Sequence, residues 1–457
     1  MEYLLNPHLS TEYPTPDQVE NFIVNKSRME CCVTIKCPKL AIKSYKEGYR
    51  YLNPPPIIEF GNSSGWSFYK YHVNTTYSKC LKEFDDNNII CNDYPLIEES
   101  SDIGIVSTVE GNINFAKITN KFNGITMTIP LKNIYFDSRQ DYKNVFISSR
   151  ILTTSGITLG TFDSGSIDVV SKFCHSKKET SKNFIDNTFI KSGDQVSLFL
   201  KDKKKLTSNF VNCNEDVFLG SPTNYKCFDI FVIDENRMGG DTTELLLSNS
   251  NLYYGCVVSI RSINPDIQLP LLRIMKPKNQ IVTLKDQYTH QENVCQMSQV
   301  CFMIVDASEY YLSLQGPKLT NKIGNRMSNY KVEVDHTCIF TLAGISERIY
   351  QFGFTTGIPN ASVTPCPFVL NHCVNVCDDI TKFDLIGENF TTNLTAWVRR
   401  MEIKTILKTE TVLTLLFNAS QIDKIKEAYR YDNADVYIYL VRNDGIIYST
   451  SIEAIFD

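Results

Sequence analysis

The sequence predicts an all-β protein built of several domains, and three observations support this prediction. The chain has 457 residues, a length that corresponds to about three domains of ordinary size. It contains 26 Phe and 24 Tyr, which together with frequent Ile, Val and Thr favour β structure. Short apolar runs alternate with turn residues along most of the chain, a pattern typical of antiparallel sandwiches and barrels.

One short amphipathic helix is expected near the N-terminus, after an unstructured lead. Thr15 can cap this helix, and Pro16 suits its first position. Val19, Phe22 and Ile23 recur at the spacing of one helical face.

A first antiparallel sandwich is expected after Met29. Its strand-like runs are residues 32–36, 57–60, 103–108, 125–131, 144–152 and 167–170. The following stretch, about residues 179–359, shows no helical pattern, so a compact β-barrel or β-trefoil suits it. Its strand-like runs are residues 196–200, 228–233, 253–260, 271–275, 300–305, 330–334 and 339–342.

A Pro-rich hinge from Ile358 to Pro367 predicts the next domain boundary. The residues after it predict a second, smaller sandwich. Two of its strands, residues 436–442 and 446–451, flank Asn443-Asp444-Gly445, a strong signal for a β-hairpin.

This last part also contains one expected helix. Ser420 is expected to cap it, and Asp423 to take the capping-box position. One face of the helix should carry Ile422, Ile425 and Tyr429.

The sequence predicts a cytosolic or nuclear protein. No apolar run reaches the length of a membrane span. The first residues lack the basic and apolar regions of a signal peptide. The 15 cysteines are odd in number and irregularly spaced, so most are expected to be reduced and buried.

Neither a metal site nor an enzyme is predicted. The tightest metal-like cluster matches no usual zinc spacing, and zinc stays an alternative to cysteines in a strand core; its members are Cys366, His372, Cys373 and Cys377. The common nucleotide-binding and hydrolase motifs do not occur. Asp335 and His336 resemble a dyad, but adjacent strand residues would point to opposite faces.

The charge distribution indicates one basic surface on an acidic protein. The net charge of −5 excludes a uniformly basic nucleic-acid coat. Residues 172–205, however, include nine lysines and four acidic residues, so the net charge of this window is about +5. Part of it, Lys201 to Lys205, follows a predicted strand and is expected at a hairpin tip. It could reach a polyanion, although a solvated loop is the alternative.

A second candidate is the run from Lys43 to Tyr51, which interleaves basic residues with tyrosines. Three prolines, Pro54 to Pro56, stiffen its exit. An arginine held in such a loop can present two donors to guanine in the major groove. The alternative is an ordinary surface loop.

Several motifs together resemble the CSL family, the Suppressor-of-Hairless / RBP-J kappa transcription factors of the Notch pathway. The N-terminal motifs are Lys43-Ser44-Tyr45, Arg50-Tyr51, Pro54-Pro55-Pro56 and Ser64-Gly65-Trp66. The C-terminal motifs are Gly387-Glu388-Asn389-Phe390-Thr391, Asn393-Leu394, Trp397 and the long run from Leu440 to Ser451. Weaker matches in the right order extend the resemblance across nearly the whole chain.

The resemblance implies three domains and a function. These are a Rel-like immunoglobulin sandwich at 1–178, a β-trefoil at 179–359 and a C-terminal Rel-like (IPT/TIG) sandwich at 360–457. The family binds double-stranded DNA with a GTGGGAA-like core in the nucleus. The resemblance also implies that the chain binds DNA as a monomer and needs no cofactor. It implies that coactivators or corepressors dock on a groove of the trefoil and that the complex regulates RNA polymerase II transcription.

Carried over by position, the resemblance assigns DNA contacts to three elements. Arg50 matches the base-reading arginine of the N-terminal loop, and the trefoil hairpin at Lys201–Leu206 reaches the minor groove. The implied DNA-binding residues are Lys43, Ser44, Tyr45, Lys46, Arg50, Tyr51, Ser171, Lys172, Lys177, Lys178, Lys201, Lys203, Lys204 and Lys205.

The chain departs from the family pattern at several of these places. Lys205 replaces a glutamine of the family hairpin, so phosphate contact is expected there in place of base reading. Ser164 to Asp168 replaces a run with three more positive charges. The groove region, around Val257 to Leu272, keeps its apolar pattern but few identities, so a Notch-type partner is left open. The competing hypothesis is a β-sandwich interaction or adhesion protein that does not bind DNA.

Overall fold

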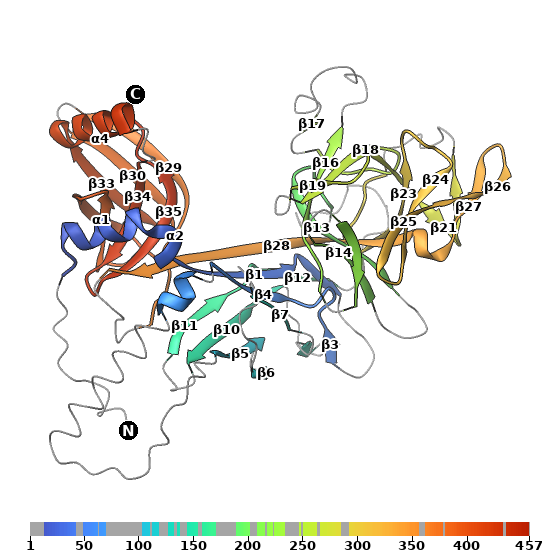
Figure 1. Cartoon of the computed structure of the whole chain (residues 1–457), viewed down its shortest axis with the longest axis horizontal. Coiled ribbons are helices and arrows are strands. Elements are labelled where there is room, and N and C mark those ends of the chain that lie inside the picture. Colours follow the sequence, from blue (N-terminus) through green and yellow to red (C-terminus); the bar gives the residue numbers. More distant parts are fainter. Residues whose placement is uncertain are drawn as a thin grey trace, which may run out of the picture.

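The fold is described from a computed structural model, in which one long strand joins three β-rich parts (Figure 1). The described residues are 13–42, 49–62, 64–69, 103–109, 112–117, 127–131, 135–137, 144–153, 158–170, 189–201, 208–214, 217–222, 224–233, 246–247, 250–262, 266–284, 292–355, 362–377, 380–432 and 436–456. Strands dominate them, and the predicted all-β class is confirmed. No helix in these ranges combines the length and apolar composition needed to cross a membrane.

The first helix, α1 (Pro16–Val24), begins where the sequence predicts. Thr15 Oγ1 accepts a hydrogen bond from the Gln18 backbone N–H (3.3 Å), and Gln18 Oε1 accepts one from the Thr15 N–H (2.7 Å). This reciprocal capping box satisfies two N–H groups that have no partner within the helix. A second helix, α2 (Lys26–Met29), follows directly and was not predicted, because four residues are too few to show a helical period.

The N-terminal part is a sandwich in which five of the seven strands below match predicted runs, whereas β6 and β11 were not predicted. One sheet pairs β1 (Cys31–Pro38), β4 (Ile57–Gly61) and β7 (Met127–Pro130). The other has the order β11 (Thr158–Asp163), β10 (Ile147–Thr153), β5 (Ile103–Val109) and β6 (Asn112–Lys117). Ile35, Phe60, Ile151 and Phe162 share one core with Trp66 from the helical residues 64–69.

Two small sheets lie at the edge of this sandwich. The first joins β2 (Leu40–Ile42), β12 (Ile167–Val170) and β9 (Asn144–Val145). The second joins β3 (Tyr49–Tyr51) and β8 (Tyr135–Asp137). They matter for function because the predicted DNA-binding segments adjoin β2, β3 and β12.

The middle of the chain forms the β-trefoil, drawn in green to orange in Figure 1. Val196, Phe228, Ile260, Phe302 and Phe340 lie in its buried core. Its described residues contain no α-helix, as predicted, but one 3-10 turn, η5 (His336–Cys338). Its strands are β13 (Asp194–Lys201), β14 (Ser208–Asn214), β15 (Val217–Ser221), β16 (Phe228–Ile233), β17 (Leu246–Leu247), β18 (Val257–Ser262), β19 (Ile267–Gln268), β20 (Leu272–Met275), β21 (Pro277–Lys278), β22 (Ile281–Thr283), β23 (Ser298–Ile304), β24 (Tyr310–Gln315), β25 (Lys318–Ile323), β26 (Asn325–Ser328) and β27 (Lys331–Glu333).

One strand, β28 (Ile339–Phe354), connects all three parts and crosses the centre of Figure 1. Its first residues pair with β13 and β23 of the trefoil. Residues 345–352 then pair with β1 of the N-terminal sandwich. The last three residues pair with the C-terminal strand β35 (Ile446–Glu453). A continuous backbone ladder therefore joins the three parts, in addition to any side-chain contact between them.

The C-terminal part is the second sandwich. Its remaining elements are β29 (Phe368–Cys377), β30 (Ile380–Glu388), β31 (Leu394–Val398), β32 (Met401–Thr409), β33 (Val412–Asn418), α4 (Ala419–Asp432) and β34 (Tyr437–Arg442). The hairpin between β34 and β35 is confirmed: the Gly445 N–H donates to the Arg442 carbonyl (3.0 Å). Gly445 has φ = 88°, a left-handed conformation that glycine adopts without steric cost.

The predicted cap of α4 is wrong by two residues. The Asn418 N–H donates to Gln421 Oε1 (3.1 Å), and the Gln421 N–H donates to Asn418 Oδ1 (2.9 Å). Asn418 and Gln421 have the same spacing as Ser420 and Asp423, so the local pattern alone fits either start. The predicted apolar face is only partly buried: Ile425 is 2% exposed, but Tyr429 is 58% exposed.

The N-terminal helix packs on the C-terminal sandwich (Figure 1). Val19 and Phe22 lie in one buried cluster with Trp397, Tyr439 and Ile447. The lead before the helix takes part, because the Tyr13 hydroxyl hydrogen-bonds Thr395 Oγ1 (3.0 Å) and Glu402 Oε1 (3.1 Å). The expected unstructured lead is therefore wrong at Tyr13, whereas residues 1–12 lie outside the described residues.

Candidate nucleic-acid interface

The first two predicted DNA-binding elements start from neighbouring strand ends. β12 pairs with β2 in parallel, and its last residue, Val170, lies opposite Ile42. Parallel strands end at the same edge of a sheet, so the chain leaves both strands on one side. The next residues along the chain are Lys43 and Ser171, which begin the two elements.

A hydrogen bond also joins the residues that follow the N-terminal loop and the trefoil hairpin. β3 carries Arg50 and Tyr51, with Arg50 opposite Phe136 of β8. Two residues after β3, Asn53 Nδ2 donates to Ser208 Oγ (3.4 Å). Ser208 is the first residue of β14, directly after the basic hairpin. This hydrogen bond, between residues 155 positions apart in the sequence, therefore links the residue that follows β3 to the base of the hairpin.

The trefoil hairpin is built as predicted up to its last strand pair, Lys201 opposite Ser208. Of the predicted DNA-binding residues, Arg50 and Tyr51 lie on β3 and Lys201 ends β13. Eleven lie outside the described residues: Lys43, Ser44, Tyr45, Lys46, Ser171, Lys172, Lys177, Lys178, Lys203, Lys204 and Lys205. What the structure describes are the strand ends that flank these residues: Ile42 lies opposite Val170, and Asn53 is hydrogen-bonded to Ser208.

An apolar cluster fixes the trefoil hairpin against the N-terminal sandwich. Phe199 and Phe210 face each other near the base of the hairpin, with ring centroids 5.3 Å apart. The Tyr225 ring packs at a tilt against Phe210 (centroids 5.5 Å apart), and the fully buried Ile57 of β4 packs in the same cluster. Because buried aromatic groups interlock in fixed orientations, the base of the hairpin and strand β4 are held in one relative position.

Charged groups reinforce this junction. Lys39 Nζ lies 2.8 Å from Asp194 Oδ1, which links the N-terminal sandwich to the first trefoil strand. Lys36, only 8% exposed, lies between Glu59 (2.8 Å) and Glu347 (3.5 Å). Burial acts to lower the pKa of the Lys36 ammonium, but Cys227 and the two carboxylates raise it above its usual value, so Lys36 is charged at neutral pH.

The run that lacks the family's positive charges is part of the packed structure. Ser164 is 3% exposed, and its Oγ accepts a hydrogen bond from the Ile147 N–H (2.9 Å). A Cβ at Gly165 would lie 2.2 Å from Ser346 Oγ, so the close approach of β28 requires glycine. Longer basic side chains are therefore not accommodated at Gly165.

The described residues do not support the zinc alternative, because they contain no group of three or more potential metal ligands. Cys366 is 4% exposed and its Sγ faces the Val363 carbonyl (3.5 Å). His372 instead stacks on Phe383, with ring centroids 5.0 Å apart. The described cysteines are free and mostly buried, as predicted.

The expected geometry of Asp335 and His336 is wrong. They do not alternate on a strand, because Asp335 caps η5 through the Thr337 N–H (2.8 Å). His336 Nδ1 thereby comes within 3.2 Å of Asp335 Oδ1. Burial acts to raise the pKa of Asp335, but hydrogen bonds from Thr337 and Lys322 outweigh it and lower this pKa to about 2. With the His336 side chain 80% exposed, the pair is a surface turn.

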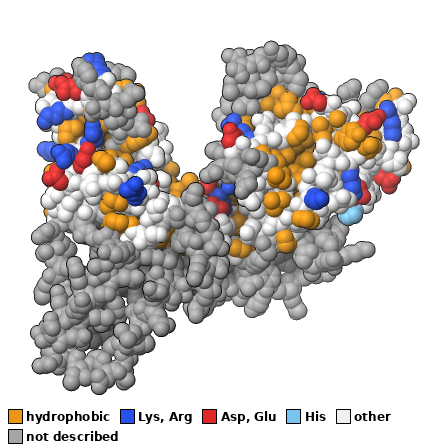
Figure 2. Space-filling view, in the orientation of Figure 1, with side chains coloured by type: hydrophobic (Ala, Val, Ile, Leu, Met, Phe, Trp, Pro, Cys, Tyr) orange, Lys and Arg blue, Asp and Glu red, His pale blue; other side chains and the backbone are white. Residues whose placement is uncertain are grey.

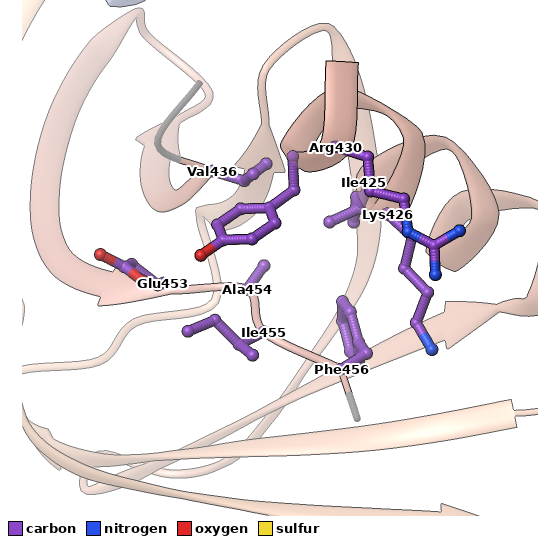
Figure 3. Close-up of a pocket in the computed structure, with 9 residues that line it drawn as sticks. Ile425, Lys426, Arg430, Val436, Glu453, Ala454, Ile455 and Phe456 are labelled. Carbon is purple, nitrogen blue, oxygen red and sulfur yellow. The ribbon is translucent and has the colours of Figure 1, made fainter. Parts of the chain in front are cut away.

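Two cavities flank α4 in the C-terminal sandwich, away from the predicted DNA-binding elements. One, of about 250 Å³, lies between α4 and the last residues of the chain, with Tyr429, Arg430 and Phe456 among its walls (Figure 3). The other, of about 330 Å³, is lined by Arg399, Arg400 and Lys424 with Glu20. Arg399 and Arg400 already pair with Glu20 (3.3 Å) and Asp17 (2.8 Å).

Three family models match the chain in the order of its three parts. The LAG1 DNA-binding model matches residues 33–185, the beta-trefoil DNA-binding domain matches 214–333, and the TIG domain matches 366–455. The human "Recombining binding protein suppressor of hairless-like protein" is 23% identical over 436 residues, which is 93% of this chain and 79% of that protein. The mouse protein of the same name is 24% identical over 391 residues, or 84% and 71%.

A β-trefoil between two sandwiches, with DNA-binding models matching the first two parts, defines a DNA-binding transcription regulator. The chain belongs to the CSL family of suppressor-of-hairless-like proteins. This is a family of transcription factors, which is consistent with the prediction that the chain is not an enzyme.

Proposed function

We propose that the chain is a nuclear transcription factor that binds a GTGGGAA-like site in duplex DNA as a monomer. The observation that supports this proposal is the linkage between the strand ends that lead into three basic elements. β2 and β12 lead into the first two elements side by side, and the Asn53–Ser208 hydrogen bond joins the loop to the trefoil hairpin. One duplex can therefore contact all three elements.

The elements have different proposed roles. Arg50 reads a guanine in the major groove, since a guanidinium can donate two hydrogen bonds to O6 and N7. The lysines of the other elements contact phosphates, and these contacts add affinity without sequence specificity. The remaining proposed contacts are Lys43, Ser44, Tyr45, Lys46, Tyr51, Ser171, Lys172, Lys177, Lys178, Lys201, Lys203, Lys204 and Lys205.

The proposal includes protein partners that regulate RNA polymerase II transcription from the DNA-bound state. Coactivators or corepressors, with a Notch-type partner among the options, would dock on the trefoil around Val257 to Leu272. In support, hydrophobic side chains gather on the trefoil face turned towards the viewer in Figure 2. Ile233 and Val257 form a small cluster with the partly buried Leu271 and Val305, separate from the main trefoil core. The boundaries proposed for the three domains remain 1–178, 179–359 and 360–457.

Selection of bound sequences from a random duplex pool tests this function. The full chain should enrich one GTGGGAA-like site, and a salt titration on that site should give a log K that falls steeply with log[salt]. Failure to bind any duplex would instead favour an interaction protein that does not contact DNA. Enrichment of an unrelated sequence would support DNA binding by this chain but contradict its proposed preference for a GTGGGAA-like site.

A further inference from the structure

A second turn of the trefoil lies beside the base of the basic hairpin. It connects β24 to β25 and consists of Gln315, Gly316, Pro317 and Lys318. Asn209, the second residue of β14, donates through Nδ2 to the Gly316 carbonyl (2.7 Å). The Gly220 N–H of β15 donates to the Pro317 carbonyl (2.9 Å). These two hydrogen bonds hold the turn against β14, the strand that leaves the hairpin, and against its neighbour β15.

The strand directions place this turn at the end of the trefoil that carries the hairpin. β14 runs away from the hairpin, and β15 returns towards it, with Ser221 opposite Phe210. β25 is antiparallel to β15, with Lys318 opposite Leu219. The chain therefore enters β25 at the end of the sheet where β13 ends and β14 begins.

Lys318 presents an unneutralised charge at this position. It is exposed, whereas the next residue, Leu319, packs against the trefoil core and fixes the face on which each side chain lies. No ion pair to Lys318 occurs among the described residues, although Lys322 on the same strand pairs with Asp335 (3.1 Å). A Cβ on Gly316 would meet no atom within 4 Å, so the turn borders open space.

We propose that the Gly316–Lys318 turn is a fourth DNA-contacting element, in which Lys318 binds a backbone phosphate beside the phosphates contacted by the hairpin. This inference rests on the proposed DNA-binding function. A cation placed beside a lysine-rich hairpin is repelled unless an anion lies between them, and a duplex carries one phosphate charge per about 1.7 Å of its axis. The contact would add affinity but no base preference.

Lys318→Ala tests the proposal, with Lys322→Ala as the matched control from the same strand. Each variant of the full chain is titrated with salt on the selected site and on a random duplex. Loss of one phosphate contact should flatten the slope of log K against log[salt] by about 0.9. Between 50 and 200 mM salt, binding by Lys318→Ala should therefore fall about three- to fourfold less than binding by the wild type.

Lys318→Arg should keep the wild-type slope, since either cation binds phosphate, and Lys322→Ala should keep it because Lys322 is already paired. The thermal unfolding temperature of each variant, compared with that of the wild type, checks that the fold is intact. If Lys318→Ala keeps the wild-type slope of log K against log[salt], or if Lys318→Arg flattens this slope as much as Lys318→Ala does, the proposed fourth element is wrong. DNA binding by the wild-type chain would be unaffected by either result. A wild-type chain that binds no duplex overturns the proposed function itself.

Discussion

The C-terminal sandwich and the end of the molecule that carries the proposed DNA contacts use cations differently. In and around the sandwich, Arg442 pairs with Asp444, Arg348 with Glu388, and Lys382 with Asp384. At the other end, strands β2, β12 and β13 lead into loops that contain lysines in excess over acids. Cations paired within the fold stabilise it, whereas cations left in loops are available to phosphates. Two related sandwiches can therefore differ in function mainly through the loops at the ends of their strands.

Arg442→Ala should have the largest effect, and on stability alone. Arg442 donates from Nε to Asp444 (3.0 Å) and from Nη1 to the Ser362 carbonyl (2.7 Å), next to the buried Tyr448 hydroxyl. Removing it leaves Asp444 without its cation and should lower the free energy of unfolding by about 3 kcal/mol. Urea unfolding measures this loss. Arg400→Ala, at an exposed pair, is the control and should cost less than about 1 kcal/mol.

The triple variant Lys203→Ala/Lys204→Ala/Lys205→Ala should show the opposite behaviour. Its stability should change by no more than about 0.5 kcal/mol, the usual range for exposed turn positions. Its binding should weaken on specific and random duplexes alike, and the slope of log K against log[salt] should flatten by about two to three units. If the slope stays at the wild-type value, these lysines do not contact phosphate, and the comparison between the two ends fails.

Arg50→Ala separates base reading from phosphate binding. Loss of a guanine contact should weaken binding to the preferred site by about 1–3 kcal/mol and relax the preference at one base pair. Binding to random DNA should change much less. Competition titrations with single-base variants of the site measure both quantities. An equal loss on specific and random duplexes would show that Arg50 acts only through its charge.

The smallest effect is expected at the junction between the two DNA-binding parts. Lys39→Ala and Lys382→Ala each remove an ion pair with a 2.8 Å contact. Each should lower the free energy of unfolding by about 1 kcal/mol or less. Of these two variants, only Lys39→Ala should weaken binding to the full site, because Lys39 pairs with the trefoil residue Asp194 whereas Lys382 pairs within the C-terminal sandwich. Equal DNA binding by the two variants would mean that this ion pair does not set the position of the two parts.

The sequence predicted the strands that carry a clear local apolar pattern, but it missed β6, β11, β14, β15, β24 and β25. The main error of extent is β28, expected at residues 339–342 but continuing to Phe354. Gly344, Ser346, Glu347 and Arg348 interrupt the apolar pattern, yet residues 345–352 pair with β1. Glu347 is stabilised there by Lys36, a residue more than 300 positions away. A local pattern cannot show a partner at that distance.

For the candidate site, the sequence predicts which residues take part but not how they are arranged. The lysine excess and the Tyr-Arg run are visible in the sequence, and the family resemblance assigns them to DNA. The linkage of the strand ends beside them is not visible, because it depends on the Ile42–Val170 register, the Asn53–Ser208 hydrogen bond and the packing of Phe199 against Phe210. The turn at Lys318 was missed for the same reason, since only its contacts with Asn209 and Gly220 place it beside the hairpin.

The long strand β28 makes the architectural unit larger than any one of the three parts. The trefoil on its own, cut out as residues 179–359, keeps residues 345–354 without β1 and β35, so it exposes an unpaired strand edge that invites aggregation. A fragment that begins after Phe354 leaves β35 without this neighbour. Interleaved strands of this kind make unfolding of one part disturb the pairing of the next, so the three parts are expected to be protected from amide hydrogen exchange as one cooperative unit along β28.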